Sequence, residues 1–424
     1  MVLLAAIGCR RADEELPSGL TAFRPAPKDP IGWPQWRGPN SSGVASSGSP
    51  AARFHASGGY RWKIEVPGEG NCSPIVWGDC VLLTTALAEM DPPTLAVLCY
   101  DRRDGQLIWQ KEAGQAQGRT HNKNGYASAT LATDGERIVA FFGSTGLFCY
   151  DLSGKPLWHA DLGDLDHQWG TASSPVIYKD LVIQLCDAGH DSSIAAFDRR
   201  TGKRLWRTER PSSGCWTAPV PIEISQGGQK RTELIVNGTD GKDADGRLVL
   251  AYDPSSGREL WRVRGTTQFV TPTTIVGSGL VYSTSGRNGP IMAIRPGGSG
   301  DVTGSHVVWK LSRGGPYIPT GIMYRDRLFI LFDNGQLTCY RPDDGEVIWT
   351  KRVRGDFSAS LVAADGRIYA SSEQGMVYVF SAADEFELLA ENNLRERIQA
   401  TPAIAGGELF IRTAFHLYCI PGTR

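Results

Sequence analysis

Short apolar runs alternate with polar turns along almost the whole chain. In residues 78–83 and 365–369, for example, a tight turn of Gly and Asp leads directly into an apolar run. Glycine and proline interrupt the sequence every few residues, and no long segment has the periodicity of an amphipathic helix. The pattern therefore predicts many short β-strands in one large all-β architecture, rather than several small domains.

A longer unit recurs within this pattern. It consists of an apolar triplet, an Asp, two or three variable residues, a Gly and, after three more residues, a Trp; its clearest copy ends at residues 198–206. The Asp side chain can bond its own backbone two residues on, and the Gly accepts a left-handed conformation, so the unit predicts a β-hairpin. We expect its Trp to lie on the outer strand and to pack between neighbouring sheets. This structural role is assigned to Trp62, Trp109, Trp158, Trp206, Trp261, Trp309 and Trp349.

The spacing of the units predicts the architecture. A period of about 40 to 50 residues with four short strands per unit is typical of a β-propeller. The last unit supplies only three strands, and residues 60–63 form a lone outer strand, so we expect the first strand to complete the last blade and remove the exposed edges. The sequence thus predicts an eight-bladed propeller of four-stranded antiparallel blades over residues 54–424. The pairs expected to open its inner strands begin at Ser73, Ser128, Ser174, Ala218, Thr271, Pro319, Ser358 and Thr401.

The charge balance argues against two classes of partner. The chain has 44 Lys and Arg residues against 45 Asp and Glu residues, a net charge of −1, and these charges are scattered singly. Neither nucleic-acid binding nor membrane association through a polybasic patch is expected. The longest apolar stretch, residues 2–7, is far shorter than the ~20 residues that a spanning helix needs, so the mature protein is expected to be soluble.

The N-terminus resembles the end of a bacterial lipoprotein signal. A short apolar run and Gly8 precede Cys9, the residue that would be lipidated. We therefore interpret residues 1–9 as a signal-like segment and residues 10–53 as a tether and N-terminal extension. The expected location is the periplasmic face of the cell envelope, with lipid anchoring through Cys9. A cytoplasmic chain with a chance apolar start is the alternative.

Most of the nine cysteines fit a packing role. Cys99, Cys149, Cys339 and Cys419 occupy one repeat position that other repeats fill with Ala or Val, so we expect buried thiols there. No C-x-x-C motif occurs, and neither a redox motif nor a zinc site is indicated. The pairing of Cys72, Cys80, Cys186 and Cys215 stays open.

The D-x-x-T-G-x-x-x-W unit of residues 198–206 resembles the pyrroloquinoline-quinone-like (PQQ-like) propeller repeat. The resemblance covers about residues 54–424. It implies either a quinoprotein alcohol dehydrogenase or a non-enzymatic propeller like the lipoprotein of the outer-membrane assembly machine. Residues 33–40 also resemble the start of propellers from planctomycete-type bacteria. The quinoprotein enzymes are implied to need a vicinal disulfide, a calcium ion and an Asp base. This chain lacks adjacent cysteines, so no catalytic residue and no calcium ligand is carried over.

Polar and aromatic residues are expected to gather on one face of the propeller. The loops that enter the inner strands and the turns between second and third strands share that face, and their side chains would suit a polar planar ligand or a peptide. The alternative is that they cap sheet ends and bind water. Residues 119–126 are the richest stretch, followed by 285–290, while the Asp-rich residues 240–246 lack EF-hand spacing, so no metal is expected. The candidate ligand-binding residues are His121, Asn122, Asn124, His167, Trp169, Trp216, Gln268, Arg287, Asn288, Tyr317 and Gln399.

These observations lead to three hypotheses of function. The first is a monomeric, non-enzymatic binding scaffold of the cell envelope that takes a protein or peptide partner and no cofactor. The second is a periplasmic quinoprotein oxidoreductase that uses PQQ with calcium. The third is a sensor of a small molecule, which a copurifying ligand would distinguish. Propellers host many activities, so the fold by itself does not decide among them.

Overall fold

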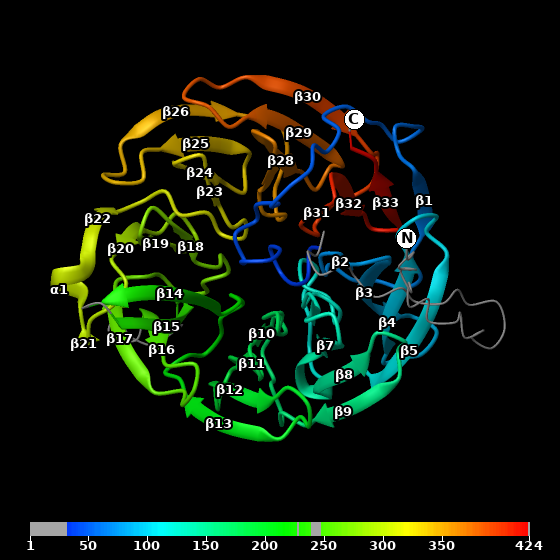
Figure 1. Ribbon diagram of the computed structural model, residues 1–424, viewed down its shortest axis with the longest axis horizontal. Helices are drawn as coiled ribbons and strands as arrows, with labels where there is room; N and C mark the ends of the chain where they lie inside the picture. Colours follow the sequence, from blue (N-terminus) through cyan, green and yellow to red (C-terminus); the bar gives the residue numbers. More distant parts are fainter. Residues whose placement is uncertain (1–31, 227–228, 239–246, 423–424) are drawn as a thin grey trace, which may run out of the picture.

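Eight antiparallel sheets stand around a common axis as the blades of a propeller (Figure 1). Seven of them have four strands, and one has a fifth, short strand that pairs parallel at its outer edge. The computed structural model describes residues 32–226, 229–238 and 247–422. Cys9, most of the expected tether and the Asp-rich residues 240–246 lie outside the described residues. The prediction of an eight-bladed, all-β propeller is confirmed.

Each blade has four antiparallel strands, counted from the axis outward. The innermost strands are β2 (Ile75–Trp77), β6 (Ala132–Thr133), β10 (Val176–Tyr178), β14 (Val220–Gln226), β18 (Ile275–Gly277), β23 (Ile322–Tyr324), β27 (Val362–Ala364) and β31 (Ala403–Ala405). The second strands are β3 (Cys80–Leu87), β7 (Arg137–Phe141), β11 (Leu181–Cys186), β15 (Gln229–Val236), β19 (Leu280–Thr284), β24 (Arg327–Leu331), β28 (Arg367–Ser371) and β32 (Glu408–Arg412). The third strands are β4 (Thr94–Asp101), β8 (Leu147–Asp151), β12 (Ser193–Asp198), β16 (Leu248–Tyr252), β20 (Ile291–Ile294), β25 (Gln336–Tyr340), β29 (Met376–Ser381) and β33 (His416–Ile420). The outermost strands are β5 (Leu107–Gln115), β9 (Pro156–Ala160), β13 (Arg204–Glu209), β17 (Glu259–Arg264), β22 (Val307–Leu311), β26 (Val347–Arg352), β30 (Leu388–Asn393) and β1 (Trp62–Glu65).

The first strand closes the ring, as predicted. Strand β1 pairs antiparallel with β33 of the last blade, with Trp62 opposite Cys419. An ionic cluster reinforces the closure, because Glu396 contacts Lys63 of β1 at 3.3 Å and His416 of β33 at 2.8 Å. Burial opposes the negative charge of Glu396, but hydrogen bonds from Thr413, His416 and Lys63 outweigh it and lower the pKa of Glu396. The first and last strands of the propeller thus share one blade, and β33 is paired along both of its edges.

The repeat tryptophans join each blade to the next. In six of the seven, the indole N–H donates to a backbone carbonyl in the outer turn of the following blade, which satisfies the polar end of a large, mostly apolar side chain. The turn glycine lies against the same ring. A Cβ on Gly202, for example, would lie 2.6 Å from the Trp158 indole. The bonds run from Trp62 to Arg102 (2.8 Å), Trp109 to Leu152 (3.2 Å), Trp158 to Arg199 (3.0 Å), Trp206 to Pro254 (3.0 Å), Trp309 to Pro342 (2.8 Å) and Trp349 to Ala383 (3.1 Å).

Trp261 differs from these six because an insertion follows it in the next blade. The inserted segment contributes the short strand β21 (Gly300–Asp301), which pairs parallel with β17, and the one-turn helix α1 (Thr303–His306). The Trp261 indole donates instead to the buried carboxylate of Glu233 at 2.8 Å. The Gly297 backbone N–H donates to the same carboxylate oxygen at 3.1 Å. A side chain therefore replaces the backbone acceptor that the insertion displaced.

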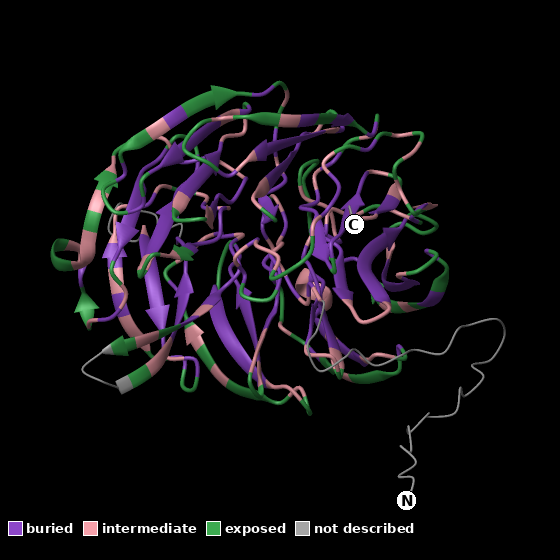
Figure 2. Cartoon of the chain, turned by 45° about the horizontal axis from the view of Figure 1, so that its top comes forward, coloured by how far each residue is buried: buried purple, intermediate pink, exposed green. Residues whose placement is uncertain are grey.

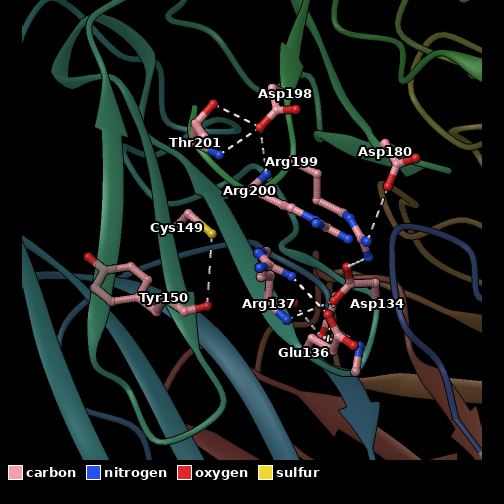
Figure 3. Close-up of polar contacts among 12 residues, drawn as sticks. Asp134, Glu136, Arg137, Cys149, Tyr150, Asp180, Asp198, Arg199, Arg200 and Thr201 are labelled. Carbon is pink, nitrogen blue, oxygen red and sulfur yellow. Dashed lines mark hydrogen bonds and ion pairs between the residues drawn. The ribbon is translucent and has the colours of Figure 1, made fainter. Parts of the chain in front are cut away.

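The Asp of the repeat unit stabilises the hairpin turn, as the close-up of blades two and three illustrates (Figure 3). Asp198 accepts hydrogen bonds from the Thr201 backbone N–H and hydroxyl, both at 2.8 Å, and from the Arg200 N–H at 3.1 Å. These bonds, led by the Thr201 hydroxyl, lower the pKa of Asp198. The adjacent Arg199 forms an ion pair with Asp134 of the preceding blade. The turn is thus both a local structure and a contact between blades.

Burial decreases from the inner strands to the outer ones (Figure 2). The eight described cysteines are all free and buried, which confirms the prediction of thiols at Cys99, Cys149, Cys339 and Cys419 and extends it to the four that stayed open. Burial raises the pKa of Cys149 to about 12, so this thiol stays protonated at neutral pH. Among the described residues, no helix has the length and apolar character needed to span a membrane. Apart from α1, the described helical structure is the short 3-10 turn η1 (Gly143–Thr145).

The described part of the N-terminal extension packs across the central channel, where the blue trace crosses the middle of the ring (Figure 1). Trp33 is fully buried and pairs with Val76 of β2. Arg37 is also buried, and its guanidinium donates to the carbonyls of Thr320, Gly321 and Leu361 in blades six and seven. Burial lowers the pKa of Arg37 to about 9, so the side chain is still charged at neutral pH. The segment therefore links blades on opposite sides of the axis.

Candidate functional site

A ring of hydroxyl groups surrounds the axis where the inner strands begin. Each hydroxyl accepts a hydrogen bond from a backbone N–H of the preceding blade, so the ring ties neighbouring blades together around the channel. The donor and acceptor pairs are Ser73 and Thr130 (3.0 Å), Thr130 and Ser174 (3.0 Å), Ala218 and Thr273 (3.2 Å), Thr273 and Thr320 (3.0 Å), Thr320 and Ser360 (2.9 Å), and Ser360 and Thr401 (2.9 Å).

The ring hydroxyls do not coincide with the first residues of the pairs predicted to open the inner strands in four blades. In three blades they lie two residues after the predicted Ser128, Thr271 and Ser358, at Thr130, Thr273 and Ser360, and in the fourth they lie one residue after Pro319, at Thr320. The reason is that a small residue occurs at both positions, and only the contact with the neighbouring blade distinguishes them. The sequence does carry one signal for the ring, because most units have a Ser or Thr at the same repeat position.

The ring opens into a cavity of about 450 Å³ along the axis. Its lining includes the six hydroxyl residues of the ring, side chains of the inner-strand loops, and Trp36 of the N-terminal segment. The Trp36 indole N–H donates to the Thr273 hydroxyl at 3.3 Å. Trp36 and the buried Arg37 contact residues just before the inner strands and lie across the channel there, so the cavity is a well that opens toward the loops of the predicted funnel face. Its size falls in the range of about 300 to 1,000 Å³ that is typical of ligand pockets.

The structure brings most of the predicted funnel residues to this well. The residues that line it are His121, Asn124, Trp169, Trp216, Arg287, Tyr317 and Gln399. Asn122, His167, Gln268 and Asn288 do not line it. Asn122 and Gln268 are exposed on the surrounding loops, while the Asn288 amide oxygen accepts a hydrogen bond from the Gly314 N–H at 3.0 Å.

An aromatic cluster forms one wall of the well. The rings of Trp169 and Trp216 lie 5.9 Å apart, and Phe269 meets Trp169 edge to face at 4.7 Å. The Arg287 guanidinium lies over three rings of this wall, at 5.2 Å from Phe269, 5.3 Å from Tyr317 and 6.0 Å from Trp169. Such cation–π contacts hold a guanidinium in place without neutralising its charge.

His167 supports this wall from behind. Its ring is 4.9 Å from the Trp216 ring and 5.5 Å from the Trp169 ring. Burial lowers the pKa of His167, which favours the neutral imidazole at neutral pH. Its Nδ1 accepts the Trp169 backbone N–H at 3.2 Å. The residue therefore positions the two indoles rather than contacting the cavity.

The polar loop of residues 119–126 bends over the opening. His121 and Asn124 form an isolated antiparallel bridge at its tip. Lys123 reaches Glu373 of blade seven at 2.9 Å, and the Asn124 amide N–H donates to the Trp169 carbonyl at 2.7 Å. The loop is thus fixed on two sides of the well. Two buried amide oxygens at the lining, those of Asn124 and Gln399, accept no hydrogen bond from the described residues.

Several residues around the well are not evident from the sequence. Trp36 lies within residues 33–40, and nothing in a linear pattern shows that this segment returns to the axis. Lys123, which lines the well, and Phe269, which packs against Trp169, lie in the predicted loops, but no local pattern distinguishes them from their neighbours. The hydroxyl ring required the contacts between blades.

Comparison with known proteins identifies a family that covers most of the chain. The family described as "Outer membrane protein assembly factor BamB" matches residues 39–215, 190–320 and 244–414. The protein of that name from Burkholderia pseudomallei (strain K96243) is 24% identical over 239 residues. That match covers 52% of this chain and 54% of the relative, so it spans about half the length of each. The predicted resemblance to PQQ-like propellers is confirmed.

Solved structures show the same fold at lower identity. BamB from Moraxella catarrhalis has a TM-score of 0.62 at 14% identity, covering 86% of this chain and 98% of that one. The computationally designed Ika8 protein has a TM-score of 0.61 at 13% identity, covering 86% of this chain and 100% of that one. A europium-containing methanol dehydrogenase has a TM-score of 0.53 at 11% identity, covering 92% and 97%. At these identities the similarity concerns the fold alone.

The residues of the well do not fit the calcium site that the quinoprotein resemblance implies. Calcium takes oxygen ligands that usually include Asp or Glu carboxylates, and the described lining contains no carboxylate. The described residues also include no group of three or more His, Cys, Asp or Glu side chains that could hold a metal ion. The basic side chains of the described lining are His121, Lys123 and Arg287. The donor set is therefore suited to accepting groups of a ligand rather than to a cation.

Proposed function

Since the chain belongs to the family of the outer membrane protein assembly factor BamB, we propose that it is a non-enzymatic binding scaffold of the cell envelope that holds a protein or peptide partner. The observation that supports this function best is the well itself. It combines aromatic walls, amide and hydroxyl groups and an arginine, which are groups that recognise a ligand by stacking and hydrogen bonding.

The proposal includes a location and a state of assembly. We propose that the protein faces the periplasm, is anchored by a lipid on Cys9, and works as a monomeric propeller with an envelope protein as its partner. Replacing Cys9 with Ser should move the protein from the membrane fraction to the soluble fraction of the cell. An unchanged distribution would contradict the anchor while leaving the binding function to be tested separately.

Site-specific photocrosslinking in cells tests the binding function. A photoreactive amino acid at Tyr317, on the wall of the well, is expected to give a discrete covalent adduct with an envelope protein. The matched control is Leu205, which is 51% exposed on the outermost strand β13 and far from the axis. Adducts of equal yield from both positions, or none from Tyr317, would contradict a partner in the well.

The quinoprotein alternative has its own test. Titration with PQQ and calcium, followed by tryptophan fluorescence and by dye reduction with simple alcohols, is expected to give no saturable change. Saturable quenching together with dye reduction would overturn the scaffold in favour of an oxidoreductase.

A further inference from the structure

Arg287 is a cation without an anionic partner in the well. Its guanidinium makes three cation–π contacts, and no carboxylate of a described residue lies within ion-pair distance of it. The side chain is exposed, so it is accessible from the cavity mouth. An arginine held against aromatic rings keeps its N–H fork available for a carboxylate.

The backbone that carries Arg287 is held in an uncommon conformation. Arg287 has a φ of 58° and Asn288 a φ of 62°, both in the left-handed region, and Phe269 on the same wall has a φ of 58°. Non-glycine residues seldom adopt this region unless the surroundings fix them there. Here the Asn288 N–H donates to the Gly315 carbonyl at 3.1 Å, and the Gly315 N–H donates to the Gly289 carbonyl at 2.7 Å. The guanidinium is therefore positioned in advance of binding.

The charges of the lining select a ligand with a single negative charge. Lys123, the other lysine or arginine of the described lining, already pairs with Glu373 at 2.9 Å. One uncompensated cation matches a carboxylate, whereas a phosphate group carries nearly two negative charges and more acceptor oxygens. The well is thus better suited to a carboxylate than to a phosphate.

Hydrogen-bond donors surround the remainder of the cavity. Each of the six ring hydroxyls accepts a backbone N–H, and none of them donates a hydrogen bond to a described residue. A hydroxyl has one proton to donate, so these protons are available to acceptors in the well. Backbone carbonyls of a peptide are such acceptors, and its N–H groups would match the unpaired amide oxygens of Asn124 and Gln399.

The shape of the well decides which part of a polypeptide can enter. Trp36 and the buried Arg37 close the far end, so a strand cannot pass through the channel. We propose that the well binds the free C-terminal end of a polypeptide, with its terminal carboxylate on Arg287 and an apolar terminal side chain between Trp169, Trp216 and Tyr317. This inference rests on the proposed function and specifies its ligand.

Binding of short peptides to the full-length protein tests the inference. The probes are acetyl-glycyl-glycyl-leucine with a free carboxylate, the same peptide as its C-terminal amide, and 4-methylpentanoate as the bare acid. Quenching of tryptophan fluorescence reports binding, since the probes do not absorb light at the wavelengths that excite indole. We expect the free-acid peptide to bind at least about tenfold more tightly than the amide, the effect of one charge-assisted contact.

Two variants locate the effect. Arg287→Gln removes the charge and is expected to abolish the difference between free acid and amide. Arg325→Gln is the matched control, because Arg325 also has a positive φ, 49°, and stacks on Tyr324 at 5.7 Å, but it does not line the well. Circular dichroism and thermal unfolding of both variants verify that each is folded.

The outcomes separate the inference from the function on which it rests. Equal binding of acid and amide to the unaltered protein, or a difference that persists in Arg287→Gln, would overturn the role of the carboxylate. If 4-methylpentanoate binds as tightly as the free-acid peptide, the proposal that the ligand is the end of a polypeptide chain would be overturned, and the well would be assigned to small organic acids. If crosslinking at Tyr317 succeeds while the peptide preference fails, the scaffold stands and only its ligand is wrong.

Discussion

Replacing Gly202 with Ala measures how closely the hairpin turn must approach the tryptophan of the preceding blade. Gly202 has a φ of 70°, and an added Cβ would lie 2.6 Å from the Trp158 indole. The left-handed conformation should cost a residue with a Cβ about 1–2 kcal/mol. The clash should cost a further ~1–3 kcal/mol, because the indole is held by its bond to the Arg199 carbonyl and cannot retreat freely. We expect a total loss of about 2–5 kcal/mol in the free energy of unfolding.

A second glycine provides the control for this prediction. Gly279 has a φ of 73°, but no atom lies within 4 Å of the position its Cβ would take. Gly279→Ala therefore carries the backbone cost without the clash. Unfolding in guanidinium chloride, followed by tryptophan fluorescence, should show that Gly202→Ala is less stable than Gly279→Ala by about 1–3 kcal/mol. Equal losses would refute the reasoning that the turn glycine is required by the contact between blades.

Two further predictions concern the ring and its closure. Thr401→Val should lower the free energy of unfolding by about 1–3 kcal/mol, since the buried Ser360 N–H, which donates to the Thr401 hydroxyl at 2.9 Å, loses its acceptor. Thermal unfolding of this variant and of Thr401→Ser, which keeps the hydroxyl, checks the prediction, and equal losses in the two variants would contradict it. Because the pKa of Glu396 is lower in the folded protein than its ordinary value of 4.5, the ionised side chain stabilises the fold at any pH above 4.5. This stabilisation is lost as the pH falls through the pKa of the folded state. Glu396→Gln should therefore be less stable than the unaltered protein near neutral pH, and the difference in the free energy of unfolding should shrink in acid. A difference that denaturant titrations find to be the same at every pH would refute the role of the charge.

Much of the architecture was predictable because its determinants are local. The Asp and Gly of each turn, the Trp after it and the spacing between units are encoded within a few residues of one another. The closing strand was also predictable. The last unit supplies only three strands and the start of the propeller supplies a lone strand, so pairing the two completes the last blade. The insertion after Trp261 weakened the repeat in the sequence, and the structure shows the compensation by Glu233.

The candidate site was predictable only in part. The face was identified from topology, and the structure places Trp169, Trp216 and Arg287 among the residues that line one cavity. The same reasoning could not separate these residues from Asn122 or Gln268, because a loop position does not reveal the direction of its side chain. Nor could it find Trp36, which lies more than 200 residues from its partner Thr273 along the chain.

The sequence by itself determined the repeat, the number of blades and the way the ring closes, since these depend on hydrophobic periodicity and turn chemistry within single units. The tertiary structure decided which side chains meet on the axis, that the N-terminal segment closes one end of the channel, and that Arg287 has aromatic rings but no carboxylate beside it. The physical reason is that the well is built by contributions from several blades. Their relative positions follow from the packing of whole sheets against one another, which no local pattern encodes.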